Sequence, residues 1–301
     1  MVDISKITTE KRNDNTKNID IASTCEILRL INKEDQMVPL AVEKAINQIA
    51  KLVDEVTETF VNGGRLFYLG AGTSGRLGVL DASEIPPTFG VENDLVIGII
   101  AGGFDALRVA IEGAEDSKEE AVKDLKTYHL NSKDFVIGIA ASGRTPYPIG
   151  AIEYANSLGC NTGCITTSFD SEIAKVAKYP IEAITGSEPL TGSTRMKSGT
   201  AQKLILNMIT TASMVKIGKV YENLMVDLQL NNNKLISRAQ QIVIDVTGVK
   251  EEIAVEYLEK YKSVKLAIFS IISEVKDIDQ IKLLLKKNNG SIREALKNLQ
   301  E

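Results

Sequence analysis

The chain has little of what several classes of protein require. Its 301 residues include one histidine and three cysteines, whereas a zinc site takes several such ligands at recognisable spacing. His129 stands beside polar residues, so we interpret it as a loop residue and expect no metal site. The cysteines, Cys25, Cys160 and Cys164, are odd in number, and the last two lie in an apolar run. This pattern favours reduced, buried thiols over a disulfide framework.

Long apolar runs and an excess of positive charge are also missing. The longest apolar run, Leu95–Ala101, falls far short of the ~20 residues that a membrane-spanning helix needs. The chain has 35 Lys and Arg against 40 Asp and Glu, a net charge of −5, and no basic block suited to phosphate backbones. Met1–Thr16 carries charges of both signs and no apolar core of a signal peptide. We therefore expect a cytoplasmic protein that binds neither nucleic acid nor membranes.

What the sequence does contain is typical of a globular α/β protein. Apolar residues make up 44% and charged residues 25%, and the length suggests one large domain plus a smaller one. Helical patterns over 38–61, from the capping box at Ser117 to Tyr128, and over 148–158 alternate with short apolar runs. This alternation predicts a parallel sheet covered on both faces. The five predicted strands are 66–69, 95–101, 135–141, 163–166 and 181–184.

The last third of the chain has a different pattern. A long helical pattern over 198–230 ends at three asparagines, and the chain beyond it reads as wholly helical. Gly248 and Gly290 are predicted helix stops, and Asp277 and Ser291 are predicted helix starts. We therefore predict an N-terminal helical segment over 1–62, a sheet domain over 63–230 and a small helical domain over 234–301.

Three polar loops follow strands of the predicted sheet. Leu69–Arg76 is rich in glycine and precedes a helix, 141–146 repeats this arrangement, and 186–200 is rich in hydroxyls. Ligands of parallel sheets bind outside the carboxyl ends of the strands, so the loops are expected to converge on one crevice. Glycines, amides and hydroxyls there suit a sugar phosphate. The alternative is that the glycines serve only to form tight turns. The predicted substrate-binding residues are Gly72, Thr73, Ser74, Ser142, Gly143, Arg144, Thr145, Glu188, Ser193 and Thr194.

Carboxylates are the remaining candidates for chemistry. Glu84 precedes Pro86 and Pro87, which we expect to break a helix of barely two turns. Glu115 precedes a predicted helix cap, close to Glu112. We therefore expect both Glu84 and Glu115 to face the crevice, with a solvated surface charge as the alternative for each.

The longer strings of the sequence resemble a known family. Gly70–Arg76 with Ser142–Thr145 resembles the sugar isomerase (SIS) domain, which is a flavodoxin-like unit that binds phosphosugars. Leu69–Leu77 running into Asp81–Glu84, with Glu112–Asp116 and Thr191–Lys197, is similar to the N-acetylmuramic acid 6-phosphate etherases over nearly the whole chain. Ser187 and Pro189-Leu190 depart from the pattern usual in that family.

The resemblance implies a lyase that needs neither metal nor cofactor. It implies cleavage of the lactyl ether of N-acetylmuramic acid 6-phosphate to N-acetylglucosamine 6-phosphate and D-lactate, within amino sugar catabolism and peptidoglycan recycling. Carried over by motif, Glu84 is the proton donor and Glu115 the base. In an open-chain sugar, a carboxylate can take the proton at C2, and a protonated carboxyl can assist the oxygen leaving C3.

Two functions of other kinds fit the same loops. An aldose–ketose phosphosugar isomerase also removes the C2 proton but needs no acid at C3. A regulator that binds phosphosugars without catalysis, resembling the glucokinase regulatory protein, is the second alternative, although that protein has two sugar-binding units and this chain shows one. Helices on either side of a single unit favour a homodimer in which a partner loop closes each site.

Overall fold

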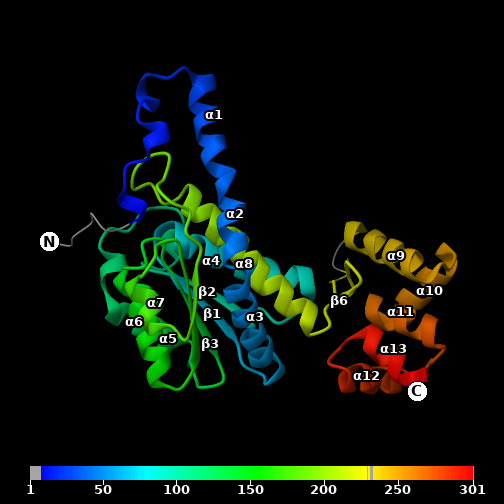
Figure 1. The fold of residues 1–301 in the computed structure, drawn as a ribbon. Helices are drawn as coiled ribbons and strands as arrows, with labels where there is room; N and C mark the ends of the chain where they lie inside the picture. The colour runs from blue at the N-terminus through cyan, green and yellow to red at the C-terminus, as the bar shows by residue number, and fades with distance from the viewer. Residues whose placement is uncertain (1–7, 229, 231–232, 301) are drawn as a thin grey trace. The chain divides into compact units, whose positions relative to one another are not determined.

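The computed structural model describes residues 8–228, 230 and 233–300, which divide into two compact units (Figure 1). The first unit comprises the described part of Met1–Ser83 together with Asp94–Thr210. The second comprises Glu84–Asn93 together with the described part of Thr211–Glu301. The division into 1–62, 63–230 and 234–301 stays a prediction.

Five parallel strands form the sheet of the first unit, in the order β2-β1-β3-β4-β5. β1 lies between its two neighbours, with Leu66 paired to Val96 on one side and to Phe135 on the other. Every residue of β1 and β3 is buried, as expected for strands covered on both faces. The predicted five-stranded parallel sheet is confirmed. The strands are β1 (Leu66–Gly70), β2 (Val96–Ile100), β3 (Phe135–Ile139), β4 (Asn161–Thr166) and β5 (Tyr179–Glu182).

Helices pack on both faces of this sheet. On one face, α5 (Lys118–Thr127) and α6 (Pro146–Ser157) share an apolar core with the side chains of Phe67 and Val136, and α7 (Glu172–Val176) continues this layer beside β4. On the other face, Leu52 of α3 (Ile46–Val61) lies against Gly163. On the same face, α4 (Gly72–Phe89) packs on Tyr68 through Gly78, where a Cβ would lie 3.0 Å from Cβ of Tyr68. The sheet is thereby shielded from water, and its polar chemistry is confined to the strand ends.

From Thr8 onward, the described N-terminal region contains three short 3-10 helices, Thr8–Glu10, Asp14–Thr16 and Ile19–Ile21, followed by α-helices. These are α1 (Thr24–Asp35), α2 (Met37–Lys44) and α3. The single helix predicted over 38–61 is wrong, because Ala45 (φ −93°, ψ 0°) separates α2 from α3. The buried positions keep helical spacing across this break, so apolar periodicity does not reveal it.

Two helices differ from their predicted lengths. α4 runs for 18 residues and includes Pro86 and Pro87 near its end, so the predicted break after two turns is wrong. The prolines remove two hydrogen-bond donors, and the helix stops at Gly90, whose φ is +60°. α8 (Lys197–Lys216) ends well before Leu230, because Gly218 (φ +77°) stops it. Part of the predicted stop, Asn231 and Asn232, lies outside the described residues.

In its described residues, the second unit has helices and one small antiparallel pair, β6 (Val220–Tyr221) and β7 (Leu224–Met225). The predicted helix stops at Gly248 and Gly290 are confirmed by their positive φ. The predicted starts are also confirmed, since the side chains of Asp277 and Ser291 accept hydrogen bonds from the amides three residues later. The helices are α9 (Asn233–Thr247), α10 (Glu251–Tyr261), α11 (Val264–Ser273), α12 (Ile278–Lys287) and α13 (Ile292–Gln300).

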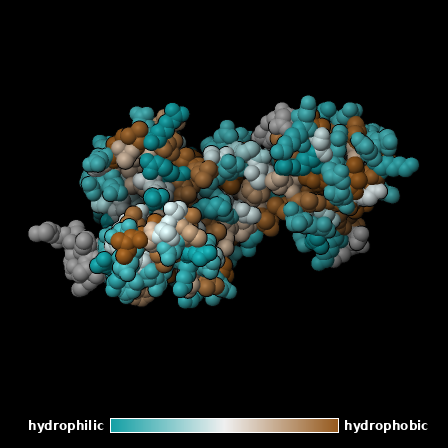
Figure 2. Space-filling view, turned by 90° about the horizontal axis from the view of Figure 1, so that it is seen from above, coloured by the Kyte–Doolittle hydropathy of each residue, from teal (hydrophilic) through white to brown (hydrophobic). Residues whose placement is uncertain are grey.

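The surface mixes polar and apolar residues. On the face shown in Figure 2, hydrophobic residues are interspersed among hydrophilic ones. Large apolar side chains are exposed on the N-terminal helices, among them Leu28, Met37, Leu40 and Ile46. Within the described parts of the chain, no helix combines the length and apolar character required to cross a bilayer.

Candidate functional site

The turn between β1 and α4 brings backbone amides to the carboxyl edge of the sheet. Gly72 begins α4 with φ at +53°. Gly75 packs directly on the strand, since a Cβ at this position would lie 2.5 Å from the carbonyl oxygen of Gly70. Only glycine allows this close approach. The first amides of an 18-residue helix are thereby presented at the strand end, where they favour an anion.

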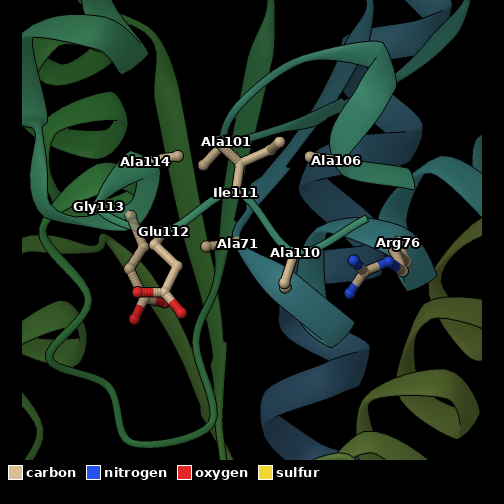
Figure 3. A pocket seen from close by; sticks show the side chains of 11 residues that line it. Ala71, Arg76, Ala101, Ala106, Ala110, Ile111, Glu112, Gly113 and Ala114 are labelled. Carbon is tan, nitrogen blue, oxygen red and sulfur yellow. The ribbon is translucent and has the colours of Figure 1, made fainter. Parts of the chain in front are cut away.

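A pocket of about 320 Å³ lies beside this turn (Figure 3). Its charged residues are Arg76, Glu112 and Glu115, and alanines with Ile111 form most of the remaining wall. Figure 3 shows Glu112 and Arg76 on opposite sides of Ala71 and Ala110. The pocket therefore combines carboxylates with one guanidinium. Its lining residues are Ala71, Gly72, Arg76, Ala101, Ala106, Ala110, Ile111, Glu112, Gly113, Ala114 and Glu115.

The segment after β2 positions the two carboxylates. It begins with Gly102 and Gly103, both at positive φ, and it reverses again at Gly113, which is left-handed (φ +75°). Glu115 lies on the 3-10 turn Ala114–Asp116 and is exposed to solvent. Glu112 and Glu115 thus line one pocket from the two sides of a single glycine turn.

The starts of α4 and α8 lie together. Thr73 approaches Gly199 closely, since a Cβ on that glycine would lie 3.3 Å from the threonine methyl. The hydroxyl of Ser74 is buried and donates to Oε1 of Gln202 at 2.9 Å. Ser74 is therefore engaged in joining two helices. The predicted convergence of the loops after β1 and β5 holds at these residues.

The loop after β3 is held by hydroxyls from the next strand. The carbonyl oxygen of Ala141 accepts hydrogen bonds from Thr166, Thr167 and Ser168 at 3.0–3.2 Å. Gly143 is at positive φ, and a Cβ there would lie 2.3 Å from Cβ of Ser171. These contacts hold the backbone at Ala141 and Gly143.

The predicted binding residues of this loop lie just before α6. Thr145 is the N-cap residue of α6, and its side chain makes no capping hydrogen bond. The hydroxyl of Ser142 accepts from the amide of Arg144 at 3.4 Å. Both hydroxyls belong to partly exposed residues at the edge of the sheet.

The loop before α8 contains one predicted binding residue with a clear structural task. Glu188 is fully buried, and its two carboxylate oxygens accept from the amides of Lys197 and Ser198 at 2.8 and 2.9 Å. It therefore caps α8. Ser193 and Thr194 form backbone turns in the same loop and are partly exposed.

Sequence reasoning missed the contacts that hold this loop from the N-terminal side. Nζ of Lys197 lies 2.7 Å from Oε2 of Glu34, and Nδ2 of Asn15 donates to the other oxygen at 2.8 Å. Thr16 donates to the carbonyl of Pro189 at 2.7 Å. Nothing in the sequence separates Glu34 from an ordinary surface glutamate on a helix.

A second buried acid joins α4 to α8. Asp81 is 5% exposed and accepts hydrogen bonds from Asn207 at 3.0 Å and Thr210 at 3.3 Å. Burial raises the pKa of Asp81, although these two donors oppose the rise. Burial and the facing Asp81 also hold the pKa of Tyr68 well above its usual range.

The structure places Glu84 and Glu115 in different units. Glu115 belongs to the first unit and lines the pocket, whereas Glu84 is an exposed residue of α4 that belongs to the second unit. Glu84 does not line the pocket. Helices rise ~1.5 Å per residue, so the twelve positions from Gly72 to Glu84 span about 18 Å along the axis of α4.

Two family models match the chain. Residues 48–156 match the glucokinase regulatory protein N-terminal SIS domain. Residues 222–294 match the C-terminal lid domain of glucokinase regulatory protein.

Curated relatives match over the full length. N-acetylmuramic acid 6-phosphate etherase of Clostridium botulinum (strain Hall) is 54% identical over 99% of this chain and 99% of its own. The enzyme of that name from Actinobacillus pleuropneumoniae serotype 5b is 54% identical over 98% of this chain and 97% of its own. A solved phosphoheptose isomerase from Neisseria gonorrhoeae is 15% identical, with a TM-score of 0.49 over 64% of this chain and 99% of its own. With relatives at 54% identity along its whole length, the chain belongs to the N-acetylmuramic acid 6-phosphate etherase family.

Proposed function

We propose that this protein cleaves the lactyl ether of N-acetylmuramic acid 6-phosphate, giving N-acetylglucosamine 6-phosphate and D-lactate. The observation that carries the proposal is the position of Glu115, which lines a pocket beside the amide-rich start of α4. The family match over 99% of the chain supports the same reaction.

In the proposed reaction, Glu115 is the base and Glu84 the acid. The Glu115 carboxylate removes the proton from C2 of the open-chain sugar, next to the aldehyde, and leaves an enolate. The electron pair of the enolate forms a C2–C3 double bond as the C3–oxygen bond breaks. Glu84 gives its proton to the departing oxygen, which becomes the hydroxyl of lactate. The ionised Glu84 then takes a proton from a water that adds to C3. Glu115, which is exposed and exchanges its proton with solvent, delivers a proton to C2.

The phosphate of the substrate is proposed to lie where Gly72 lines the pocket, away from the acidic wall. Glu112 and Glu115 disfavour a dianion at that wall, since like charges repel strongly at short distance. The amides at Gly72–Gly75 offer neutral donors and a helix start, and the loop Ser142–Thr145 adds hydroxyls and the cationic Arg144. Thr73, Glu188, Ser193 and Thr194 remain proposed members of this binding region, with Glu188 acting through its cap on α8.

We also propose that the protein is a cytoplasmic homodimer active in amino sugar catabolism and peptidoglycan recycling. The exposed Leu28, Met37, Leu40 and Ile46 on neighbouring N-terminal helices supply an apolar surface for a second copy. In this assembly, a loop of the partner closes each site.

The proposal is tested by incubating the protein with N-acetylmuramic acid 6-phosphate in deuterated water. We expect lactate to be released and deuterium to appear at C2 of the N-acetylglucosamine 6-phosphate. Glu115→Gln is expected to lose both exchange and release, and Glu84→Gln to lose release more than exchange. Asp116→Asn is the matched control, because Asp116 is exposed and lies next to Glu115 but does not line the pocket. Lactate without deuterium at C2 would contradict elimination through a C2 carbanion.

A regulator that binds phosphosugars without turnover is the second candidate. The names of the two matching family models favour it. It predicts saturable binding of the sugar phosphate with no lactate release and no exchange at C2. Release of lactate at a catalytic rate, abolished by Glu115→Gln, would exclude this alternative.

A further inference from the structure

Arg76 is the one positively charged residue among those lining the acidic pocket. Its Nε donates to the carbonyl oxygen of Leu107 at 3.1 Å. This bond ties the guanidinium to the wall formed by the segment after β2, and its terminal nitrogens make no hydrogen bond to another described residue. Among the residues that the structure describes, no carboxylate lies within ion-pair distance of Arg76.

The arrangement is unusual because two carboxylates line the same pocket. In Figure 3, Glu112 lies across Ala71 and Ala110 from Arg76. A free guanidinium facing a small pocket is a ready receptor for a carboxylate, which it binds through two parallel hydrogen bonds. The pocket thus offers a cation on one wall and carboxylates on the other.

The proposed substrate carries two anionic groups. Its phosphate is assigned above to the start of α4 and the loop before α6, where amides and hydroxyls lie together with Arg144. Its lactyl carboxylate needs a separate partner, and Arg76 is the only cation lining this pocket. Resting on the proposed function, we propose that Arg76 binds the lactyl carboxylate and thereby selects the muramic acid ether over sugar phosphates that lack this group.

The assignment also orients the reaction. With the lactyl carboxylate at Arg76, the ether oxygen and C3 face the middle of the pocket, and C2 is turned toward the wall that holds Glu115. The alanines at 71 and 110 leave room between the two walls for the sugar chain. Arg76 is therefore a specificity-determining residue that acts by holding the leaving group.

The test compares Arg76→Gln with the unchanged protein on two substrates. One is N-acetylmuramic acid 6-phosphate, and the other is its lactamide, in which a neutral amide replaces the carboxylate. We expect kcat/KM for the acid to fall roughly tenfold to hundredfold, as for loss of a hydrogen-bonded charge. The value for the lactamide should change less than about threefold, and Arg76→Lys should be intermediate on the acid. The Kd of N-acetylglucosamine 6-phosphate, measured by calorimetry, should stay unchanged.

Arg108→Gln is the matched control. Arg108 is an exposed residue of the segment after β2, next to Leu107, and it does not line the pocket. Equal losses on the acid and the lactamide would overturn the proposal, as would weaker binding of N-acetylglucosamine 6-phosphate, which would place Arg76 at the phosphate. If Arg76→Gln does not fold, Arg76→Lys carries the same comparison. Failure of the proposed function is visible separately, because the unchanged protein would then release no lactate, and the role of Arg76 would fall with it.

Discussion

Nζ of Lys197 and Oε2 of Glu34 lie 2.7 Å apart, and the two side chains are 4% and 9% exposed. The pair joins the first residue of α8 to α1, across 163 positions of sequence. The carbonyl of Ser187 accepts a second hydrogen bond from the same Nζ at 2.9 Å. The hydroxyl-rich loop before α8 is therefore anchored by a buried charge pair.

Breaking this pair is expected to destabilise the protein strongly. Lys197→Met leaves the Glu34 carboxylate buried without its cation, which typically costs ~3–5 kcal/mol. The measurement is the free energy of unfolding from urea denaturation. Lys118→Met is the matched control, because the Lys118–Glu153 pair is 44% exposed on each side and should contribute less than ~1 kcal/mol. Equal losses of unfolding free energy in the two variants would show that the Lys197–Glu34 pair contributes no more than an exposed pair.

The stability of the protein should depend on pH through Asp81. Burial raises its pKa in the folded state, so the folded protein holds this proton more tightly than the unfolded chain. The resulting stability is full below the unfolded pKa and is lost as pH rises through the folded pKa. Asp81→Asn has no proton to lose. Its free energy of unfolding should therefore increase relative to that of the unchanged protein as pH rises from the unfolded to the folded pKa of Asp81, and the difference should stay constant at higher pH. Paired urea denaturations between about pH 3 and pH 8 measure the difference, and a difference independent of pH would contradict the prediction.

Gly75 is expected to tolerate no side chain. A Cβ there would lie 2.5 Å from the Gly70 carbonyl oxygen and 2.7 Å from Cγ1 of Ile100, so Gly75→Ala must push α4 away from β1. We expect the free energy of unfolding to fall by ~1–3 kcal/mol and lactate release to decrease. Thermal unfolding and an enzyme assay measure the two effects. Gly63→Ala is the control, since Gly63 has positive φ but open space around it. It should lose about 1 kcal/mol and keep its activity, and comparable activity losses in both variants would contradict this account.

The sheet was predictable because its strands are buried on both faces. Each strand is therefore a short continuous apolar run, which can be recognised from the sequence alone. Helix ends were less predictable. The break at Ala45 and the stop at Gly218 depend on the backbone conformation of single residues, whereas the apolar spacing continues past both. The prolines after Glu84 misled for the opposite reason, because the backbone stays helical to Phe89 although Pro86 and Pro87 donate no hydrogen bond.

The candidate site was predictable at the level of loops but not of roles. Residue type identified Ser74 and Glu188 as polar groups near a ligand, but it does not distinguish a group that faces the ligand from one that joins two helices. In the structure, Ser74 bonds to Gln202 and Glu188 caps α8. Arg76 was visible only as the last residue of the glycine-rich segment Leu69–Arg76, since its role depends on the pocket that it lines.

The two proposed catalytic carboxylates are expected to come from different chains of the homodimer. Gly72 lines the pocket, and Glu84 lies about 18 Å farther along the same helix at 1.5 Å per residue, a span that a glutamate side chain does not bridge. Glu84→Gln and Glu115→Gln should each be inactive alone, whereas dimers reassembled from an equal mixture should recover about a quarter of the activity, because half the dimers are mixed and each mixed dimer has one intact site. Lactate release after joint unfolding and refolding measures this, with each variant refolded alone as the control. A mixture as inactive as its parents would place both carboxylates in one chain.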